Sequence, residues 1–219
     1  MIPTVDVWEA VSRLAKSGTA GYQDDTEFNI DLKSVQYTLM GLMSPLNSVN
    51  QTAKDILSPF MEPLAGSSDA QGVLAKPADY FQLDSIIING YPVFPIETNE
   101  LAMIQYIPTR RPNASENRYY YFQRLDSINI LPAAVYAVSG TYIRKPDDAG
   151  ITLTPVSTPD RDYVTPTSDG DLEWNERVFN IIVYMMLLKL GLAFEKQILF
   201  EFSQLGIALE QSTLNTLRQ

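Results

Sequence analysis

The hydrophobic positions change their period twice along the chain, from helical to alternating and back to helical. Over residues 6–16 and 26–43 the apolar residues recur every three or four positions, which predicts two amphipathic helices. A weaker helical pattern covers residues 49–60, and the segment GSSDAQG at 66–72 is typical of a linker. The pattern therefore predicts an N-terminal helical region over residues 1–70.

From residue 71 to 156 prolines recur and the apolar runs become short. The runs are rich in β-branched and aromatic residues, which predicts strands of a small antiparallel β subdomain. Gly140 lies in an alternating stretch and suits a β-bulge. The expected strands are FQLDSIIING (81–90), ELAMIQYIP (100–108), RYYYFQRL (118–125), SINILP (127–132) and VYAVSGTYIRKP (135–146).

The last region, residues 157–219, is expected to be an acidic loop followed by two helices. Residues 155–170 are dense in Pro, Thr, Ser and Asp, as in a loop. Residues 178–194 are apolar almost all the way round, and residues 194–217 are amphipathic. Together the three regions predict an α+β fold with N-terminal helices, a central antiparallel β subdomain and a C-terminal helical hairpin, which form one structural unit.

The apolar helix at 178–194 needs cover on every side. A membrane span is the weaker interpretation, because the run is at the lower limit of length and contains Lys189, whose charge costs about 2.5–3.5 kcal/mol near a bilayer centre and less near an end. Deep core packing and contact with a neighbouring subunit remain. We expect one face of the helix to pack on its own domain and another against a neighbour, in an obligate oligomer.

Composition removes most catalytic chemistry. The 219 residues contain neither Cys nor His, which excludes disulfides, thiolate nucleophiles, imidazole acid–base catalysis and the common zinc sites. There is no Gly-rich phosphate loop or nucleophile elbow, although a carboxylate-pair hydrolase stays open as an alternative. The segment DGDLE at 169–173 lacks the frame of a calcium loop. We expect a protein that is not an enzyme, with no catalytic residue, no cofactor and no metal site.

The net charge of −10 argues against general binding to nucleic acid. One segment has the opposite bias: TRRPNASENRYYYFQRL at 109–125 carries Arg110, Arg111, Arg118 and Arg124 among aromatic residues. A platform for single-stranded nucleic acid has this composition, but we favour a hairpin with a charged tip. If DNA or a partner is contacted, these four arginines are the residues expected to contact it.

Residues 147–176 hold eight carboxylates and one basic residue, Arg161. Acids before the helix at 178–194 oppose the positive end of its dipole, and Gly170 or Asp171 is the expected cap. The start of the chain, MIPTVDVWEA, lacks the pattern of a secretory signal, which favours synthesis in the cytosol.

Several segments resemble one protein family. The segments GYQDDTEFNIDLKSVQYTLM (21–40), TYIRKP (141–146), DLEWNERVFNIIVYMMLLKLGL (171–192) and QILFEFSQ (197–204) are similar to head-to-tail connector, or ring, proteins of short-tailed, crAss-like bacteriophages. The segment AKPADY (75–80) resembles an element that leads into their sheet. The likeness touches both ends and the middle of the chain.

The resemblance implies a virion structural protein that forms a ring, commonly of twelve copies, between the portal and the tail. Its partners would be further copies, the portal protein and other neck or tail proteins, with DNA passing through the channel without sequence-specific binding and no membrane contact. An acidic lumen wall over residues 147–176 would let DNA slide. Alternatives are another virion component, such as a tail-fibre adaptor or minor capsid protein, or a non-viral binding module.

In such a ring the residues expected at the subunit interface come from the apolar helix and from the strand that precedes the acidic loop. For each of them ordinary core packing is the alternative. They are Trp174, Phe179, Ile182, Tyr184, Met186 and Leu190 in the helical segment, and Tyr142, Ile143, Arg144 and Lys145 on the strand.

Overall fold

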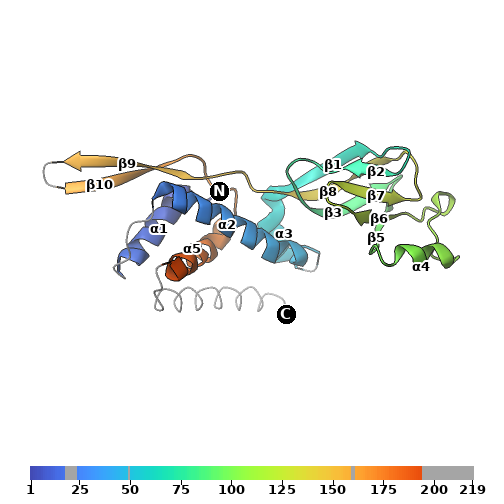
Figure 1. Cartoon of the computed structure of the whole chain (residues 1–219), viewed down its shortest axis with the longest axis horizontal. Helices are drawn as coiled ribbons and strands as arrows, with labels where there is room; N and C mark the ends of the chain where they lie inside the picture. Colours follow the sequence, from blue (N-terminus) through green and yellow to red (C-terminus); the bar gives the residue numbers. More distant parts are fainter. Residues whose placement is uncertain (18–23, 49, 159–160, 194–219) are drawn as a thin grey trace. The chain divides into compact units, whose positions relative to one another are not determined.

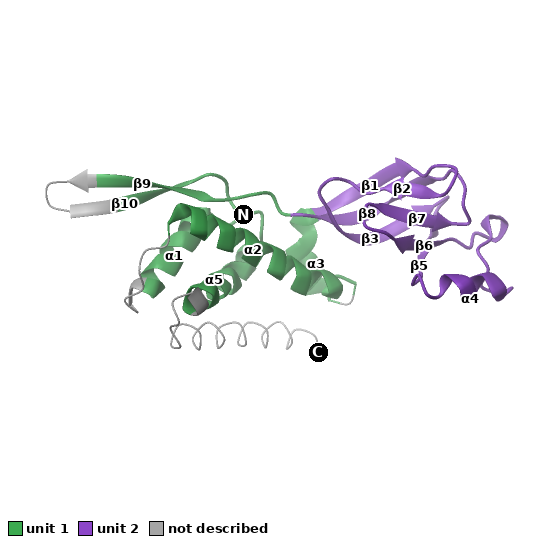
Figure 2. Cartoon of the chain, viewed as in Figure 1, with its two compact units in different colours: residues 1–60, 146–219 green, residues 61–145 purple. Residues whose placement is uncertain are grey.

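The computed structural model describes residues 1–17, 24–48, 50–158 and 161–193, and its fold is α+β as expected (Figure 1). The chain divides into two compact units (Figure 2). Unit 1 consists of residues 1–60 and 146–219, and unit 2 of residues 61–145. The boundaries thus lie before those expected at residues 70 and 156. The second helix of the expected C-terminal hairpin lies outside the described residues.

Helices form most of the described part of unit 1, and the helices predicted near both ends of the chain are present. Both α1 and α2 pack against α5. Asp24 caps α2: its carboxylate accepts a hydrogen bond from the Glu27 N–H at 2.7 Å. The helices are α1 (Thr4–Ser17), α2 (Asp25–Met43), α3 (Gln51–Leu57) and α5 (Phe179–Ala193), with short 3₁₀ turns at Ser44–Leu46, Ser58–Phe60 and Glu176–Val178.

The N-terminus of unit 1 is tied to the segment before α5. The backbones of Ile2 and Leu172 exchange two hydrogen bonds of 2.9 Å, and the Thr4 hydroxyl donates to the Gly170 carbonyl. The expected cap at Gly170 or Asp171 is wrong, because the 3₁₀ turn begins only at Glu176 and α5 at Phe179. Asn175 caps the 3₁₀ turn that leads into α5 by accepting a hydrogen bond from the Arg177 N–H at 3.1 Å.

The predicted acidic loop is instead mostly a β-hairpin. Strands β9 (Ile151–Thr158) and β10 (Arg161–Ser168) pair with each other in antiparallel register and with no other described strand. They form a two-stranded ribbon that belongs to unit 1 and extends beyond α1 (Figure 1). The loop was predicted from the Pro, Thr, Ser and Asp content of this segment. Its threonines recur at alternate positions, which favours strands, and proline is tolerated at a strand edge.

Unit 2 contains two four-stranded sheets. The first has the order β1-β8-β3-β4 and is antiparallel; the second has the order β2-β7-β6-β5, and its edge strand β5 runs parallel to β6. Asn89 and Gly90, both with positive φ, form the tight turn between β3 and β4. The strands are β1 (Met61–Ser67), β2 (Val73–Ala75), β3 (Tyr80–Ile88), β4 (Tyr91–Pro92), β5 (Phe94–Pro95), β6 (Tyr120–Gln123), β7 (Ser127–Leu131) and β8 (Ala137–Arg144).

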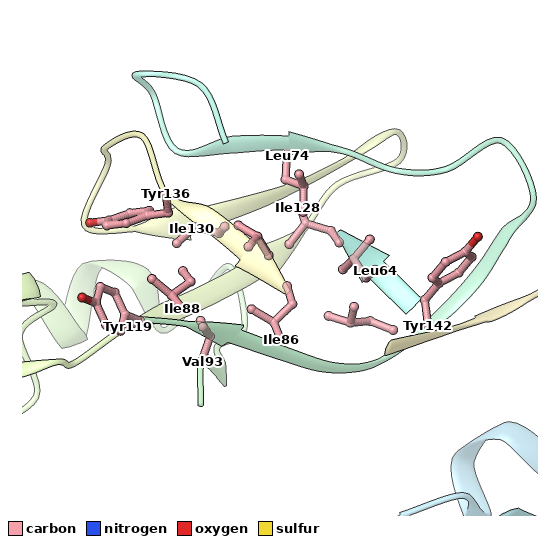
Figure 3. Packing of buried hydrophobic residues seen from close by; sticks show 12 residues of the cluster. Leu64, Leu74, Ile86, Ile88, Val93, Tyr119, Ile128, Ile130, Tyr136 and Tyr142 are labelled. Carbon is pink, nitrogen blue, oxygen red and sulfur yellow. The ribbon is translucent and has the colours of Figure 1, made fainter. Parts of the chain in front are cut away.

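Both sheets contribute to one core (Figure 3). Leu64 and Ile86 of the first sheet face Leu74 and Ile128 of the second, and every one of these side chains is buried. Tyr119 closes one end of the core, with its ring edge-on to Tyr136 at a centroid distance of 5.4 Å. Unit 2 therefore has a hydrophobic core of its own.

Several features of unit 2 differ from the expectation. The short strands β2, β4 and β5 were not predicted, and β5 pairs in parallel within a subdomain expected to be antiparallel. Residues 100–108, predicted as a strand, contain the helix α4 (Leu101–Tyr106), because the buried position is Ile104 and its apolar partners recur at helical spacing. The strand β1 was not predicted either; it contains Pro63 and is an edge strand, where proline is tolerated. The irregularity expected at Gly140 occurs on the paired strand β3, between Leu83 and Ser85.

Candidate interaction surfaces

The helix residues predicted at a subunit interface lie mainly in the core of unit 1. Trp174, Ile182 and Met186 have no exposed surface and Leu190 is 4 % exposed. Phe179 and Tyr184 are half-buried. The chain itself therefore covers most of this apolar helix, so its burial does not require a neighbouring subunit. Within the ranges that the structure describes, no helix is both long and apolar enough to cross a bilayer.

The strand residues predicted at the interface have separate roles within unit 2. Ile143 and Tyr142 are in the core, and the Tyr142 hydroxyl donates to Asp79 at 3.1 Å. Arg144 forms an ion pair with Glu62 at 3.6 Å. Only Lys145 of the four is exposed. Burial of the first two leaves little of this strand for contact with another subunit.

The structure separates the four arginines predicted at the tip. Arg118 is used inside its own loop: it pairs with Glu116 and donates to the carbonyl oxygens of Thr109 and Pro108. Arg110 and Arg111 are exposed and form no ion pair with any residue that the structure describes. Arg124 is exposed in the β6–β7 turn, with its guanidinium 5.5 Å from the centre of the Phe122 ring. The hairpin that does form joins β6 and β7, and of the four arginines only Arg124 lies in its turn.

The second sheet of unit 2 has an apolar outer face, on the side away from the core. Tyr119 and Tyr121 point to the core, so Tyr120 and Phe122 point outward. Parallel pairing puts Phe94 of β5 beside Tyr120, and antiparallel pairing puts Leu131 on the other side of Tyr120. We call these four residues, Phe94, Tyr120, Phe122 and Leu131, the aromatic face. Phe94 is 56 % exposed and the other three are half-buried.

The three unpaired arginines border the aromatic face. Arg124 lies over Phe122. Arg110 lines a depression of about 260 Å³ together with Tyr120, Met103 and Glu100. Arg111 lines another, of about 600 Å³, together with Leu131 and the helix residue Tyr106, which is 86 % exposed. Large apolar side chains and arginines are thus concentrated at one surface of unit 2.

The residues of the β9–β10 ribbon also have a defined orientation. The Ile151 N–H and C=O both bond to the side-chain amide of Asn29, at 2.9 Å each. The backbone hydrogen-bonding groups of Ile151 therefore point away from β10. Because the direction of these backbone groups alternates from residue to residue along a strand, the backbone nitrogen and C=O of Pro155 also point away from β10. Pro166 lies opposite Leu153 and for the same reason points away from β9. The prolines therefore remove no hydrogen bond from the ribbon and close its outer edges to a further strand.

A depression of about 450 Å³ lies where the ribbon meets α2. Its lining includes Ile30, which is 64 % exposed, and the carboxylates of Asp148 and Asp169. Lys33 also lines it and forms an ion pair with Asp148 at 2.7 Å, which raises the pKa of Lys33. The Thr152 hydroxyl donates to Asp169 at 2.6 Å. This depression, which we call the ribbon pocket, is acidic and partly apolar.

Charge is distributed unequally between the units. Unit 2 contains 7 of the 16 basic residues and 8 of the 26 acidic residues, so its formal net charge is −1. Unit 1 contains the other 9 basic and 18 acidic residues, so its net charge is −9. Almost all of the negative charge therefore belongs to unit 1.

The acidic DGDLE segment has structural contacts. Asp169 accepts from Thr152, Asp171 accepts from the Ser168 hydroxyl at 3.2 Å, and Glu173 accepts from the Asp147 N–H at 3.0 Å. Across the described parts of the chain, no three acidic side chains gather closely enough to hold a metal ion.

The sequence pattern contained part of the aromatic face but not all of it. Alternation in RYYYFQRL was sufficient to put Tyr120 and Phe122 on one side of a strand. Phe94 could not be assigned to this face from the sequence, because β5 has only two residues and joins the sheet by a parallel pairing across the α4 segment.

Comparison with models of known protein families gives no match. A search of curated proteins finds no significant similarity to the chain.

Proposed function

We propose that this protein is a virion structural protein, a subunit of the ring that connects the portal to the tail in a short-tailed, crAss-like bacteriophage. The proposal combines the sequence resemblance with one structural observation. Each copy carries two exposed surfaces of unlike character, the aromatic face with its arginines on unit 2 and the acidic ribbon pocket on unit 1. A closed ring is built from heterologous contacts, which require two different surfaces on every subunit.

The charge distribution supports a passive role toward DNA. Unit 1 has a net charge of −9, and a surface of this sign does not gain affinity from counterion release on binding a phosphate backbone. DNA would pass such a subunit without sequence-specific binding. The partners are further copies of the chain, the portal protein and other neck or tail proteins.

The test is assembly of the purified full-length chain, alone and with the portal protein encoded by the same genome. Native mass spectrometry measures the copy number, and electron microscopy of the same sample shows whether a central channel is present. We expect closed rings of one copy number, twelve if the resemblance extends to stoichiometry. A chain that remains monomeric under both conditions, or that forms open filaments, would contradict the proposed function.

A further inference from the structure

The described chain covers the aromatic face only in part: Phe94 is 56 % exposed, whereas Tyr120 and Leu131 each line a depression together with residues of α4. The outer side of a sheet in a small antiparallel domain is normally polar, because only the inner side is covered. Here Phe94, Tyr120 and Leu131 instead form an apolar row across three strands. Phe122 lies beside this row, one position along the same side of β6. Tyr, Phe, Met and Arg are the residues enriched at the centre of protein interfaces; the aromatic face contains the first two, and Met103 and the arginines border it.

We infer that the aromatic face of unit 2 binds the ribbon pocket of unit 1 on a second copy of this chain. The inference rests on the proposed function, since it identifies which two unlike surfaces meet around the ring. Each subunit would use its aromatic face toward one neighbour and its ribbon pocket toward the other, so the contact is heterologous and able to close.

Charge complementarity is the reason for choosing a second copy. Arg110, Arg111 and Arg124 have no ion-pair partner among the described residues of their own chain, whereas unit 1 carries a net charge of −9. Asp148 and Asp169 line the ribbon pocket together with Lys33, and the side chain of Asp148 is 73 % exposed even in its ion pair with Lys33. Opposite charges on two surfaces steer them together and fix their orientation.

The apolar parts of the two surfaces also correspond. Ile30 is exposed on the wall of the ribbon pocket, and Tyr106 and Met103 are exposed beside the aromatic face, at 86 % and 64 %. The pocket volume of about 450 Å³ leaves room for a large side chain. The prolines at both outer edges of the ribbon favour contact through side chains over addition of a strand.

Single-stranded nucleic acid is the competing occupant, because stacked aromatic rings and arginines also bind bases. Unit 2 has no net positive charge and the whole chain has a net charge of −10, so long-range attraction to a phosphate backbone is missing. A second copy is therefore favoured, and nucleic acid is one outcome of the test.

Disulfide trapping tests the contact directly, because the chain contains no cysteine of its own. One variant carries Tyr106→Cys and another carries Ile30→Cys, both at exposed positions. The two variants are mixed and oxidised, with the portal protein added if assembly needs it. They should give a disulfide-linked dimer that contains one chain of each variant. A chain with both cysteines should give a covalent ladder that ends at the copy number of the ring.

The matched control replaces Tyr106→Cys with Ile87→Cys, on the other sheet of unit 2, where the side chain is 38 % exposed. This pair should give no mixed dimer. If the control cross-links as strongly, or if the chain with both cysteines closes on itself as a monomer, the proposed contact is wrong.

Charge reversal gives a second measurement. Arg110→Glu with Arg111→Glu should weaken association of the otherwise unmodified chain by at least about tenfold. Asp148→Arg with Asp169→Arg on the partner should restore association with this variant. Arg13→Glu with Lys54→Glu, two exposed residues of unit 1, makes the same change in charge and should leave association unchanged.

The outcomes separate this contact from the proposed function. Rings that assemble normally with both arginines reversed and without the mixed disulfide would overturn the contact and leave the ring intact as a function. A chain that never assembles, even with the portal protein, overturns both. Tight binding of a single-stranded oligonucleotide that is lost in the Arg110→Glu, Arg111→Glu variant, without any mixed disulfide, would assign the aromatic face to nucleic acid.

Discussion

The largest buried side chain of unit 1 is Trp174. Its ring lies 4.6 Å from that of Phe60, centre to centre, and its indole N–H donates to the Gln36 side chain at 3.3 Å. Gln36 is itself buried, so this hydrogen bond satisfies a polar group that would otherwise be costly. Ile182 and Met186 of α5 are also buried within unit 1 and have no exposed surface.

Ile182→Ala is expected to lower the free energy of unfolding by about 2–5 kcal/mol, because it removes buried methyl groups and leaves a cavity. Urea unfolding followed by tryptophan fluorescence measures this, since Trp8 and Trp174 both lie in unit 1. The exposed Leu42→Ala is the control, outside both proposed contact surfaces, and should change stability by less than about 0.5 kcal/mol. A loss of stability that appears only when subunits dissociate at low protein concentration would favour the interface role instead.

A tyrosine cluster in unit 2 responds to alkaline pH. Burial raises the pKa of Tyr80 to about 12, and the neighbouring Tyr121 adds to the shift. The Tyr80 ring stacks on Tyr142 at 5.9 Å, and its hydroxyl donates to Gln123 at 2.8 Å. The folded state therefore favours the neutral phenol of Tyr80 more than the unfolded chain does.

From this shift we expect the stability of unit 2 to fall as the pH rises from 10 toward 12. Below pH 10 the phenol is neutral in both states and its contribution is complete; above pH 10 the unfolded chain loses the proton first, which favours unfolding. Urea midpoints from circular dichroism across this range measure the slope. Tyr80→Phe should make it shallower, and an unchanged slope would show that Tyr80 does not titrate as described.

At the scale of elements, the β9–β10 ribbon pairs with no other strand that the structure describes. A two-stranded hairpin alone is only marginally stable in water. Its base is anchored, because Asn29 bonds to both backbone groups of Ile151 and because the Asp169 N–H donates to the Gly150 carbonyl at 2.9 Å. The outward prolines, Pro155 and Pro166, then keep its edges from pairing with other chains.

Pro155→Val with Pro166→Val should increase self-association, because each substitution adds an unpaired N–H at an outer edge of the ribbon. Light scattering during slow heating measures the aggregation rate. Thr154→Val with Thr165→Val is the matched control, since these residues pair with each other across the ribbon and add apolar surface without an edge N–H. Equal aggregation of both variants would mean that the prolines do not protect the edges.

At the scale of the whole molecule, unit 2 is inserted into unit 1. Its first and last strands are neighbours, with Met61 paired to Ile143, so the chain enters and leaves unit 2 at adjacent points. Its core is shared by both of its sheets. These are the properties of a domain that folds separately.

Residues 61–145 expressed alone should fold cooperatively, with the circular dichroism spectrum of a β protein. Residues 71–156, the segment that the sequence pattern favoured, are the matched control and should not fold, because they lack β1, which pairs along β8. Thermal unfolding of the two fragments makes the comparison. A fragment 61–145 that is unfolded would show that unit 2 depends on unit 1.

The amino-acid pattern was sufficient for features that depend on neighbours along the chain. The helices α1, α2 and α5 and the strands β3, β6, β7 and β8 follow from periodicity and propensity, which act over a few residues. The α+β class follows from their order. Residues 100–108 were misread because a single helical turn with one buried residue, Ile104, leaves too short a pattern to separate from a strand.

Other features depend on contacts between residues far apart in the sequence, and only the tertiary structure decided them. Burial of α5 results from its packing against α1 and α2, so no property of the helix alone could distinguish core from subunit interface. The parallel pairing of β5 with β6 brings Phe94 beside Tyr120, and an ion pair removes Arg118 from the arginines that border the aromatic face. Local sequence determines which elements form, whereas long-range packing determines which of their side chains remain exposed.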